Sequence, residues 1–205
     1  MPTQAKLSKP SKMPCPTFAL QALDTCPGAY DDQGNIKEVC SKCYAMRGSY
    51  VWKDTKAVRN NNLVASKQLG FVEDMVRMIN KIKGRHFRWF DSGDIYSQDF
   101  LVKIVDICFN TPLVKHWIPT KSRELFNQDT WELLESLPNV RVRYSSPSIT
   151  GQYEDKHGST VVPDKDYFSD DNPARVFNCR VTDKKCGPCR ACWSKNIKVI
   201  AYLQH

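Results

Sequence analysis

The sequence lacks the features expected of a membrane-spanning or exported protein. No segment contains about eighteen consecutive apolar residues, which is the minimum for a membrane-spanning helix. Residues 1–12 are polar and basic and contain no apolar run, so they do not resemble a signal peptide. We therefore expect a soluble, cytoplasmic protein with no membrane partner.

Signatures of nucleic-acid recognition are also missing. The net charge of +8 and the pI of about 9.0 would favour contact with nucleic acid. The basic residues, however, lie in short, separate clusters, and no arginine-rich arm, RNP signature or helix-turn-helix pattern accompanies them. Nucleic-acid binding is therefore an alternative that the sequence does not favour.

Two familiar catalytic patterns are absent. The chain has no Gly-x-Ser-x-Gly motif, and its four histidines show no spacing that marks them as catalytic. The sequence therefore gives no indication of a serine–histidine–acid triad. The Cys-x-x-x-Cys-x-x-Cys motif that is usual in radical S-adenosylmethionine enzymes does not occur either.

Cysteine, in contrast, is abundant. A chain of 205 residues can bury a core without covalent staples, so its nine cysteines need another explanation. In a reducing cytoplasm, closely spaced cysteines are more often metal ligands than disulfides, and an odd number cannot pair completely. The sequence therefore predicts a metal centre, with disulfides and redox-active thiols as the alternatives.

The densest group of cysteines is near the C-terminus. Cys186, Cys189 and Cys192 recur every three residues, and Cys179 lies seven residues before the first of them. This run is typical of bacterial ferredoxins, in which a [4Fe-4S] cluster takes its remaining ligand from a distant position. The Cys-Gly-Pro-Cys segment within it also matches the thioredoxin motif, but a third cysteine follows within the next turn. The spacing therefore predicts an iron–sulfur cluster.

The first half of the chain supplies a second set, which consists of Cys26 and the pair Cys40 and Cys43. We expect Cys43 or Cys26 to complete the cluster, so that both ends of the chain meet at one metal centre. Cys40 and Cys179 are reserve ligands. Zinc is the alternative metal, because two separated Cys-x-x-Cys pairs also form zinc sites.

The middle of the chain alternates predicted strands and helices. Strands that begin near residues 87, 115 and 140 are 25 to 28 residues apart, which leaves room for a crossover helix. Eight such units usually need about 250 residues, so we expect an α/β fold with a partial or distorted (β/α) TIM-like barrel. Strand 140–144 alternates apolar and charged residues, which predicts a partly solvated edge. The expected elements are helices at 54–69, 71–82, 98–109 and 124–137 and strands at 87–91, 115–119, 140–144, 160–162, 175–177 and 197–203.

We expect a single domain over residues 1–205. Residues 1–50 should form an irregular lead-in that carries cysteines, because its prolines prevent a long helix. Residues 54–145 contain the βα units, and residues 146–205 contain a loop, the C-terminal cysteines and a closing strand.

Polar residues follow three of the predicted strands, at the position where parallel α/β folds bind their ligands. Segments 91–94, 119–123 and 145–148 should therefore share one rim. The alternative is that these residues only form turns and cap the helices that follow. The candidate catalytic residues are Asp91, Ser92, Asp94, Thr120, Lys121 and Arg123.

Five motifs occur in an order that resembles a group of phage-encoded proteins called gene product 88. They are TCPGA at 25–29, CYA at 43–45, SGD at 92–94, PTKS at 119–122 and CGPCRACW at 186–193, and together they span nearly the whole chain. The resemblance implies a viral protein of the infected bacterial cytoplasm, with a barrel-like α/β fold, a four-iron cluster and a hydrolase or esterase-like activity. It places the cluster ligands among Cys26, Cys43, Cys186, Cys189 and Cys192.

Two functions are consistent with these features. In the first, the chain is an iron–sulfur hydrolase of small ester-like substrates, in which rim acids activate a nucleophile and Lys121 or Arg123 stabilises an oxyanion. In the second, it is a non-enzymatic cluster protein that senses redox state or binds nucleic acid. Radical chemistry is less expected, because it requires a cluster that only three cysteines hold.

Overall fold

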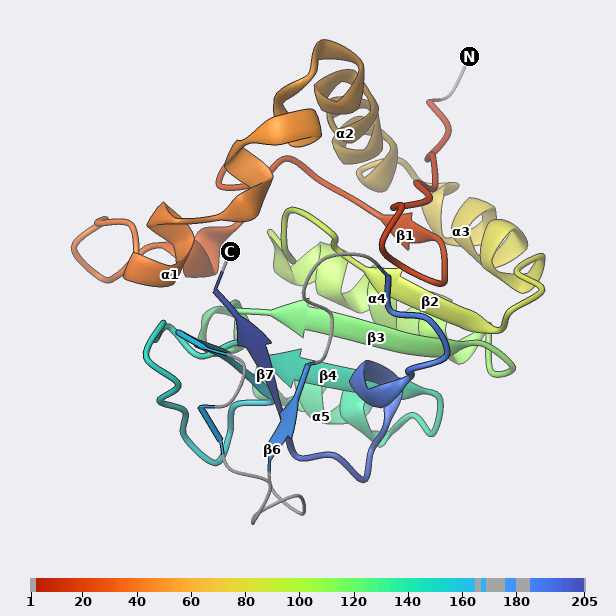
Figure 1. The fold of residues 1–205 in the computed structure, drawn as a ribbon. Helices are drawn as coiled ribbons and strands as arrows, with labels where there is room; N and C mark the ends of the chain where they lie inside the picture. Colours follow the sequence, from red (N-terminus) through yellow and green to blue (C-terminus); the bar gives the residue numbers. More distant parts are fainter. Residues whose placement is uncertain (1–2, 165–166, 169–175, 180–184, 205) are drawn as a thin grey trace.

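The chain forms two parallel β-sheets, with the longer helices packed beside the first (Figure 1). The computed structural model describes residues 3–164, 167–168, 176–179 and 185–204. In these residues no helix is both long enough and apolar enough to cross a membrane. The helices are α1 (Glu38–Ser41), α2 (Lys53–Ser66), α3 (Phe71–Asn80), α4 (Gln98–Phe109) and α5 (Gln128–Ser136).

The first sheet contains four strands that follow the order of the chain. They are β1 (Thr17–Phe18), β2 (His86–Trp89), β3 (Lys115–Thr120) and β4 (Val140–Tyr144), and each pair of neighbours is parallel. Helices α4 and α5 provide the crossovers and lie behind the sheet in Figure 1. Because the strands are parallel, the four loops that leave their carboxyl ends share one edge.

The second sheet contains β5 (Ser159–Val162), β7 (Val199–Leu203) and β6 (Val176–Asn178), with β7 in the centre. Its pairs are also parallel. A single bridge between Ser145 and Ser159 joins it to the end of β4. The parallel α/β architecture is therefore confirmed, whereas the described strands do not show a closed barrel.

Most expected elements lie where the sequence pattern predicts them. Strand β1 was not predicted, because it contains only two residues, which are too few to show an alternating pattern. Helix α5 begins at Gln128 rather than at residue 124, since the side chain of Asn127 accepts a hydrogen bond from the Thr130 amide and starts the helix there. The predicted strand at 175–177 is observed as β6, and Arg175 lies outside the described residues.

The core of the first sheet contains a neutral histidine. His116 on β3 is fully buried, and its Nδ1 accepts a hydrogen bond from Trp89 Nε1 at 3.2 Å. Its Nε2 therefore carries the proton and donates to Thr111 Oγ1 at 2.8 Å, and this hydroxyl donates to the Ile107 carbonyl. Burial lowers the pKa of His116 to about 3, so the ring stays neutral in the folded protein.

Acidification should destabilise the protein through His116. The unfolded chain takes up a proton near pH 6.5, whereas the folded chain does not until about pH 3. The free energy of unfolding should therefore fall by about 2 kcal/mol between pH 6.5 and pH 5 on account of this residue. Urea unfolding at both pH values would measure it. The variant His116→Gln should lose less stability over the same interval, and an equal loss in both proteins would contradict the assignment.

Strand β4 is the last strand of the first sheet and its Arg141 is half-exposed, but Arg143 does not face solvent as the alternating sequence predicts. Arg143 is fully buried, and its guanidinium donates hydrogen bonds to six backbone carbonyls. The prediction failed because a single arginine can satisfy several carbonyl groups of neighbouring loops while its charge is removed from water. The six acceptors are the carbonyls of Gly158, Ala191, Cys192, Ser194, Ile197 and Lys198, at 2.9 to 3.3 Å.

Replacing Arg143 with methionine should destabilise the fold strongly. The change leaves the Cys192 and Ser194 carbonyls without a donor among the described residues, and we expect a loss of about 3–5 kcal/mol in the free energy of unfolding. Arg141→Met is the matched control, because Arg141 lies on the same strand but bonds only the Ile197 and Lys198 carbonyls from a half-exposed position. Its loss should be about 1 kcal/mol. Similar losses in the two variants, measured by urea unfolding, would count against this role of Arg143.

Candidate functional site

A cavity of about 1040 Å³ lies at the carboxyl ends of the strands. Its lining includes residues at or after the carboxyl ends of the first four strands and the end of β7. From the first sheet these are Ala22, Leu23, Cys26, Ala29, and residues 91–94, 119–121 and 145–146. The rim that the sequence predicts after β2, β3 and β4 is thus present. The cavity is also lined by six of the nine cysteines, which are Cys26, Cys40, Cys43, Cys179, Cys186 and Cys192.

The loops after β1 and β2 are joined by hydrogen bonds. The Leu20 amide donates to the Ser92 carbonyl at 3.0 Å, and the Ser92 hydroxyl donates back to the Leu20 carbonyl at 2.6 Å. Gly93 lies between them with φ of +78°, and a Cβ there would be 2.5 Å from the Leu20 side chain. Only glycine allows this close approach. The SGD motif therefore serves to seat the cysteine-bearing loop on the sheet.

Asp94 connects the same site to the loop after β3. One carboxylate oxygen accepts a hydrogen bond from the Ile95 amide at 2.7 Å, and the other accepts one from the Lys121 amide at 2.8 Å. Asp94 is buried, and burial raises the pKa of its carboxyl group, while the bonds from these two amides oppose that shift. Its arrangement is that of a structural carboxylate between two loops.

Gly28 brings the first cysteine against this loop. A Cβ on Gly28 would lie 2.3 Å from the Lys121 carbonyl oxygen, a distance that real side chains do not tolerate. The backbone beside Cys26 therefore packs directly on the segment after β3. Glycine in the TCPGA motif is required by this contact rather than by its own backbone angles.

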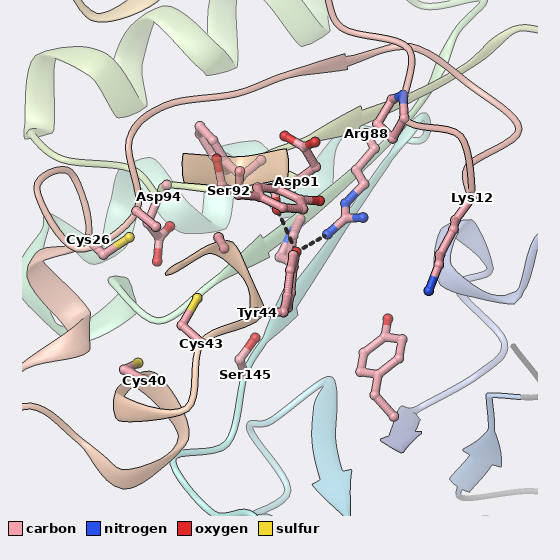
Figure 2. Close-up of a pocket in the computed structure, with 18 of the residues that line it drawn as sticks. Lys12, Cys26, Cys40, Cys43, Tyr44, Arg88, Asp91, Ser92, Asp94 and Ser145 are labelled. Carbon is pink, nitrogen blue, oxygen red and sulfur yellow. Dashed lines mark hydrogen bonds between the residues drawn. The ribbon is translucent and has the colours of Figure 1, made fainter. Parts of the chain in front are cut away.

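Three thiols of the first half gather on one side of the cavity. Cys26 precedes a short 3₁₀ turn, Cys40 lies in α1, and the Cys43 amide donates to the Cys40 carbonyl at 3.1 Å. Figure 2 shows the three side chains together beside Asp94. We call Cys26, Cys40 and Cys43 the front set. It comes from one continuous segment between β1 and α2.

The front set is suited to bind a cation. Burial raises the pKa of Cys26 to about 12, and the charges of Asp94, Cys40 and Cys43 add to the increase. Burial also raises the pKa of Cys40, and Cys43 and Asp94 act on it in the same direction. These groups thus raise one another's cost of ionisation, and a bound metal would remove that cost by replacing the protons.

A single metal ion does not fit the described side chains. Among them, no three cysteine, histidine, aspartate or glutamate residues come close enough to hold one ion. A zinc site with bonds of about 2.3 Å would need its sulfur atoms roughly 4 Å apart. An iron–sulfur cluster binds each thiolate through a different iron, so its ligand sulfur atoms lie farther apart than those around a single zinc ion. Whether the front set holds zinc or an iron–sulfur cluster therefore stays a prediction.

The C-terminal cysteines form a separate group, which we call the rear set: Cys179, Cys186, Cys189 and Cys192. The Cys186 amide donates to the Lys12 carbonyl at 3.0 Å. In Figure 2, Lys12 and the front set lie on opposite sides of Tyr44 and Arg88. Both sets line one cavity, but Cys43 groups with Cys26 and Cys40. The single shared centre stays a prediction, and the described contacts favour two groups.

Of the remaining candidate residues, Thr120 and Arg123 make structural contacts and Lys121 lines the cavity. The Thr120 hydroxyl accepts a hydrogen bond from the Ser122 amide at 3.0 Å, which is a turn contact. The Arg123 guanidinium lies 4.3 Å from the centre of the Tyr144 ring and does not line the cavity. Lys121 lines the cavity, and its charge lowers the pKa of Cys40 against the effect of burial.

Asp91 differs from the other acids. It is only 7 % exposed, lines the cavity, and has one carboxylate oxygen with no hydrogen-bond partner among the described residues. Burial raises its pKa, and the charges of Arg88 and Arg59 lower it. An unpartnered buried oxygen between two arginines is a feature of a binding site.

Sequence reasoning missed the residues that divide the cavity. The Tyr44 hydroxyl donates to the Asp91 carbonyl at 2.5 Å and accepts from Arg88 at 3.2 Å (Figure 2). The Arg88 guanidinium also stacks on Trp117, 4.6 Å from the ring centre. The one available signal was the position of Tyr44 directly after Cys43.

Comparison with known proteins gives one match. A family model described as "Gene product 88" matches residues 2–200, which is nearly the whole chain. No curated protein and no solved structure matches it.

Replacing Gly28 with alanine should weaken metal binding. The added methyl group would displace the Cys26 loop from Lys121, and such a change in the support of a ligand costs about 10–100-fold in metal affinity. Iron content after anaerobic reconstitution with iron and sulfide would measure it. Gly70→Ala is the control, since its Cβ would meet open space at an ordinary φ. A wild-type iron content in Gly28→Ala would contradict the role of this loop.

Proposed function

Because the chain belongs to the gene product 88 family, a name that states no reaction, we propose from the site that it is an iron–sulfur enzyme with an open cluster. Cys26, Cys40 and Cys43 would hold a [4Fe-4S] cluster, and a cluster held by three cysteines would leave one iron for a small molecule in the cavity. The observation that carries this proposal is the grouping of three thiols beside Asp94 in the lining of a large cavity.

Ligation by three cysteines is the arrangement that radical S-adenosylmethionine enzymes require. When bound, such a cluster and its cosubstrate supply one-electron chemistry that amino-acid side chains cannot provide. The spacing in this chain differs from the usual motif, because thirteen residues separate Cys26 from Cys40. The fold compensates for this distance, since Lys37 and Gly28 bring the two ends of the insertion together: Lys37 Nζ donates to the Gly28 carbonyl at 3.1 Å.

The cavity provides groups for an amino-acid cosubstrate. Asp91 has an unpartnered carboxylate oxygen, and Arg88 has an unpartnered Nε–H group among the described residues. Asp91 would accept a hydrogen bond from the ammonium group of the cosubstrate, and the guanidinium of Arg88 would meet its carboxylate. This pairing of a buried acid with a nearby arginine matches the two charges of an amino acid.

Basic residues dominate the rest of the lining and favour an anionic substrate. Seven basic residues face three acidic ones around the cavity. Part of this charge offsets the thiolates, and the remainder favours phosphate or carboxylate groups. The basic residues are Lys9, Lys12, Lys42, Arg47, Arg59, Arg88 and Lys121, and the acidic ones are Asp54, Asp91 and Asp94.

The hydrolase hypothesis has less support than this one. The Ser92 hydroxyl donates to the Leu20 carbonyl, and Thr120 accepts from the Ser122 amide, so both hydroxyls have structural partners. None of the described histidines lines the cavity. A nucleophile with an adjacent base is thus not visible among the described rim residues. Ester hydrolysis and nucleic-acid binding stay predictions that no observation favours.

The open cluster should respond to S-adenosylmethionine. Protein prepared without oxygen and reduced with dithionite should show an electron paramagnetic resonance signal that changes when S-adenosylmethionine is added, and it should cleave the cosubstrate reductively. Asp91→Asn should weaken cosubstrate binding about 10–100-fold, because a charge-assisted hydrogen bond is lost.

Cys108→Ala is the control, since Cys108 is buried in α4 and belongs to neither set. Its signal and cleavage should match those of the wild type. A signal that stays unchanged at saturating cosubstrate, together with no cleavage, would refute the open cluster.

A further inference from the structure

We propose that the rear set holds a second [4Fe-4S] cluster, distinct from the one at the front set. Cys179, Cys186, Cys189 and Cys192 supply four thiolates, so this cluster has no iron left for a substrate. The inference goes beyond the proposed function, because it stands whether or not the front set binds S-adenosylmethionine.

Backbone contacts fix the rear cysteines on two segments of the chain. The Cys189 amide donates to the Cys186 carbonyl at 3.1 Å, which closes a turn and places these cysteines on one short loop with Cys192. The Cys179 amide donates to the Ala201 carbonyl at 2.8 Å, which fixes Cys179 beside the end of β7. The next residue, Tyr202, has its hydroxyl 3.3 Å from the Cys192 sulfur. Cys179 and Cys192 therefore approach each other across Tyr202.

The loop that carries Cys192 is held rigidly. Arg143 donates to the Cys192 carbonyl at 2.9 Å and to the Ala191 carbonyl at 3.0 Å. Trp193 donates from its ring nitrogen to the Phe87 carbonyl at 2.9 Å and packs on the Trp117 ring. A ligand on a loop fixed from both sides is preorganised, which lowers the entropy lost on binding a cluster.

The charges around the rear set favour an anionic cluster. The principal charges that act on Cys186 are those of Cys189, Arg88 and Arg190, and those that act on Cys192 are Cys179 and two arginines. Arginine side chains offset the negative charge of such a cluster.

Tyr44 and Arg88 separate the two sets. The hydrogen bond between them at 3.2 Å and the stacking of Arg88 on Trp117 place these side chains between the front set and Lys12 (Figure 2). Lys12 is next to Met13, whose sulfur lies 3.8 Å from that of Cys186. A single cluster shared by both sets would have to displace this pair of side chains. The positions of the two sets therefore point to two centres.

Metal analysis of three proteins tests the inference. Full-length protein reconstituted without oxygen should contain ~8 iron atoms and ~8 sulfides per chain. The triple variant Cys26→Ala, Cys40→Ala, Cys43→Ala and the triple variant Cys186→Ala, Cys189→Ala, Cys192→Ala should each keep about half of that iron. Reduced spectra of the two variants should differ and should add up to the wild-type spectrum. Only the variant with the front set intact should respond to S-adenosylmethionine if the proposed function holds.

Three outcomes would overturn the second cluster. Loss of all iron in either triple variant would show one shared centre. A wild-type iron content in the Cys186→Ala, Cys189→Ala, Cys192→Ala variant would show that the rear set binds no iron. Zinc in place of iron would show a zinc site. Cys189→Ser is a milder variant in case the triple change prevents folding, because Cys189 is exposed, and it should lower iron content without changing the circular dichroism spectrum. Cys108→Ala should keep the full iron content. Failure at the front set alone would leave the rear half of the iron in place, so the two proposals fail separately.

Discussion

The buried guanidinium of Arg143 is the interaction on which the C-terminal half of the structure depends. It donates to carbonyls at Gly158, before β5, and in the segment 191–198, before β7. Among the described residues the carbonyls of Cys192 and Ser194 accept from no other donor, and an unsatisfied buried carbonyl costs about 1–3 kcal/mol. The Arg143 side chain therefore supplies hydrogen bonds that a neighbouring strand would otherwise provide. It holds the second sheet and the rear cysteines against the first sheet.

A different set of contacts organises the carboxyl edge of the first sheet. Ser92 bonds the loop after β1, and Asp94 bonds the loop after β3, so residues of one motif join three neighbouring loops. Gly93 and Gly28 allow the loop backbones to approach closely enough for this. The result is a rigid floor for the front set. Rigid support matters because a cluster ligand that shifts by a small distance loses much of its affinity.

The distribution of charge links the two cysteine sets to one cavity. The charge of Arg88 acts on Cys186, Cys192 and Asp91, and its guanidinium donates a hydrogen bond to the Tyr44 hydroxyl. A cationic group between two anionic centres lowers their mutual repulsion. The proposed arrangement thus places an open cluster and a closed cluster on either side of one arginine, with the substrate cavity shared between them.

The sequence by itself determined the alternation of strands and helices, the parallel α/β class and the location of polar residues after β2, β3 and β4, because these follow from periodicity and spacing along the chain. It also named five cysteines as candidate ligands and Cys40 and Cys179 as reserves, and their role as ligands stays a prediction. Only the tertiary structure decided that Cys43 lies with Cys26 and Cys40, that Arg143 turns inward, and that the Ser92 hydroxyl serves a neighbouring loop. These features depend on contacts between residues far apart in the chain, such as Arg143 with Cys192 and Leu20 with Ser92, and local patterns carry no information about such pairs.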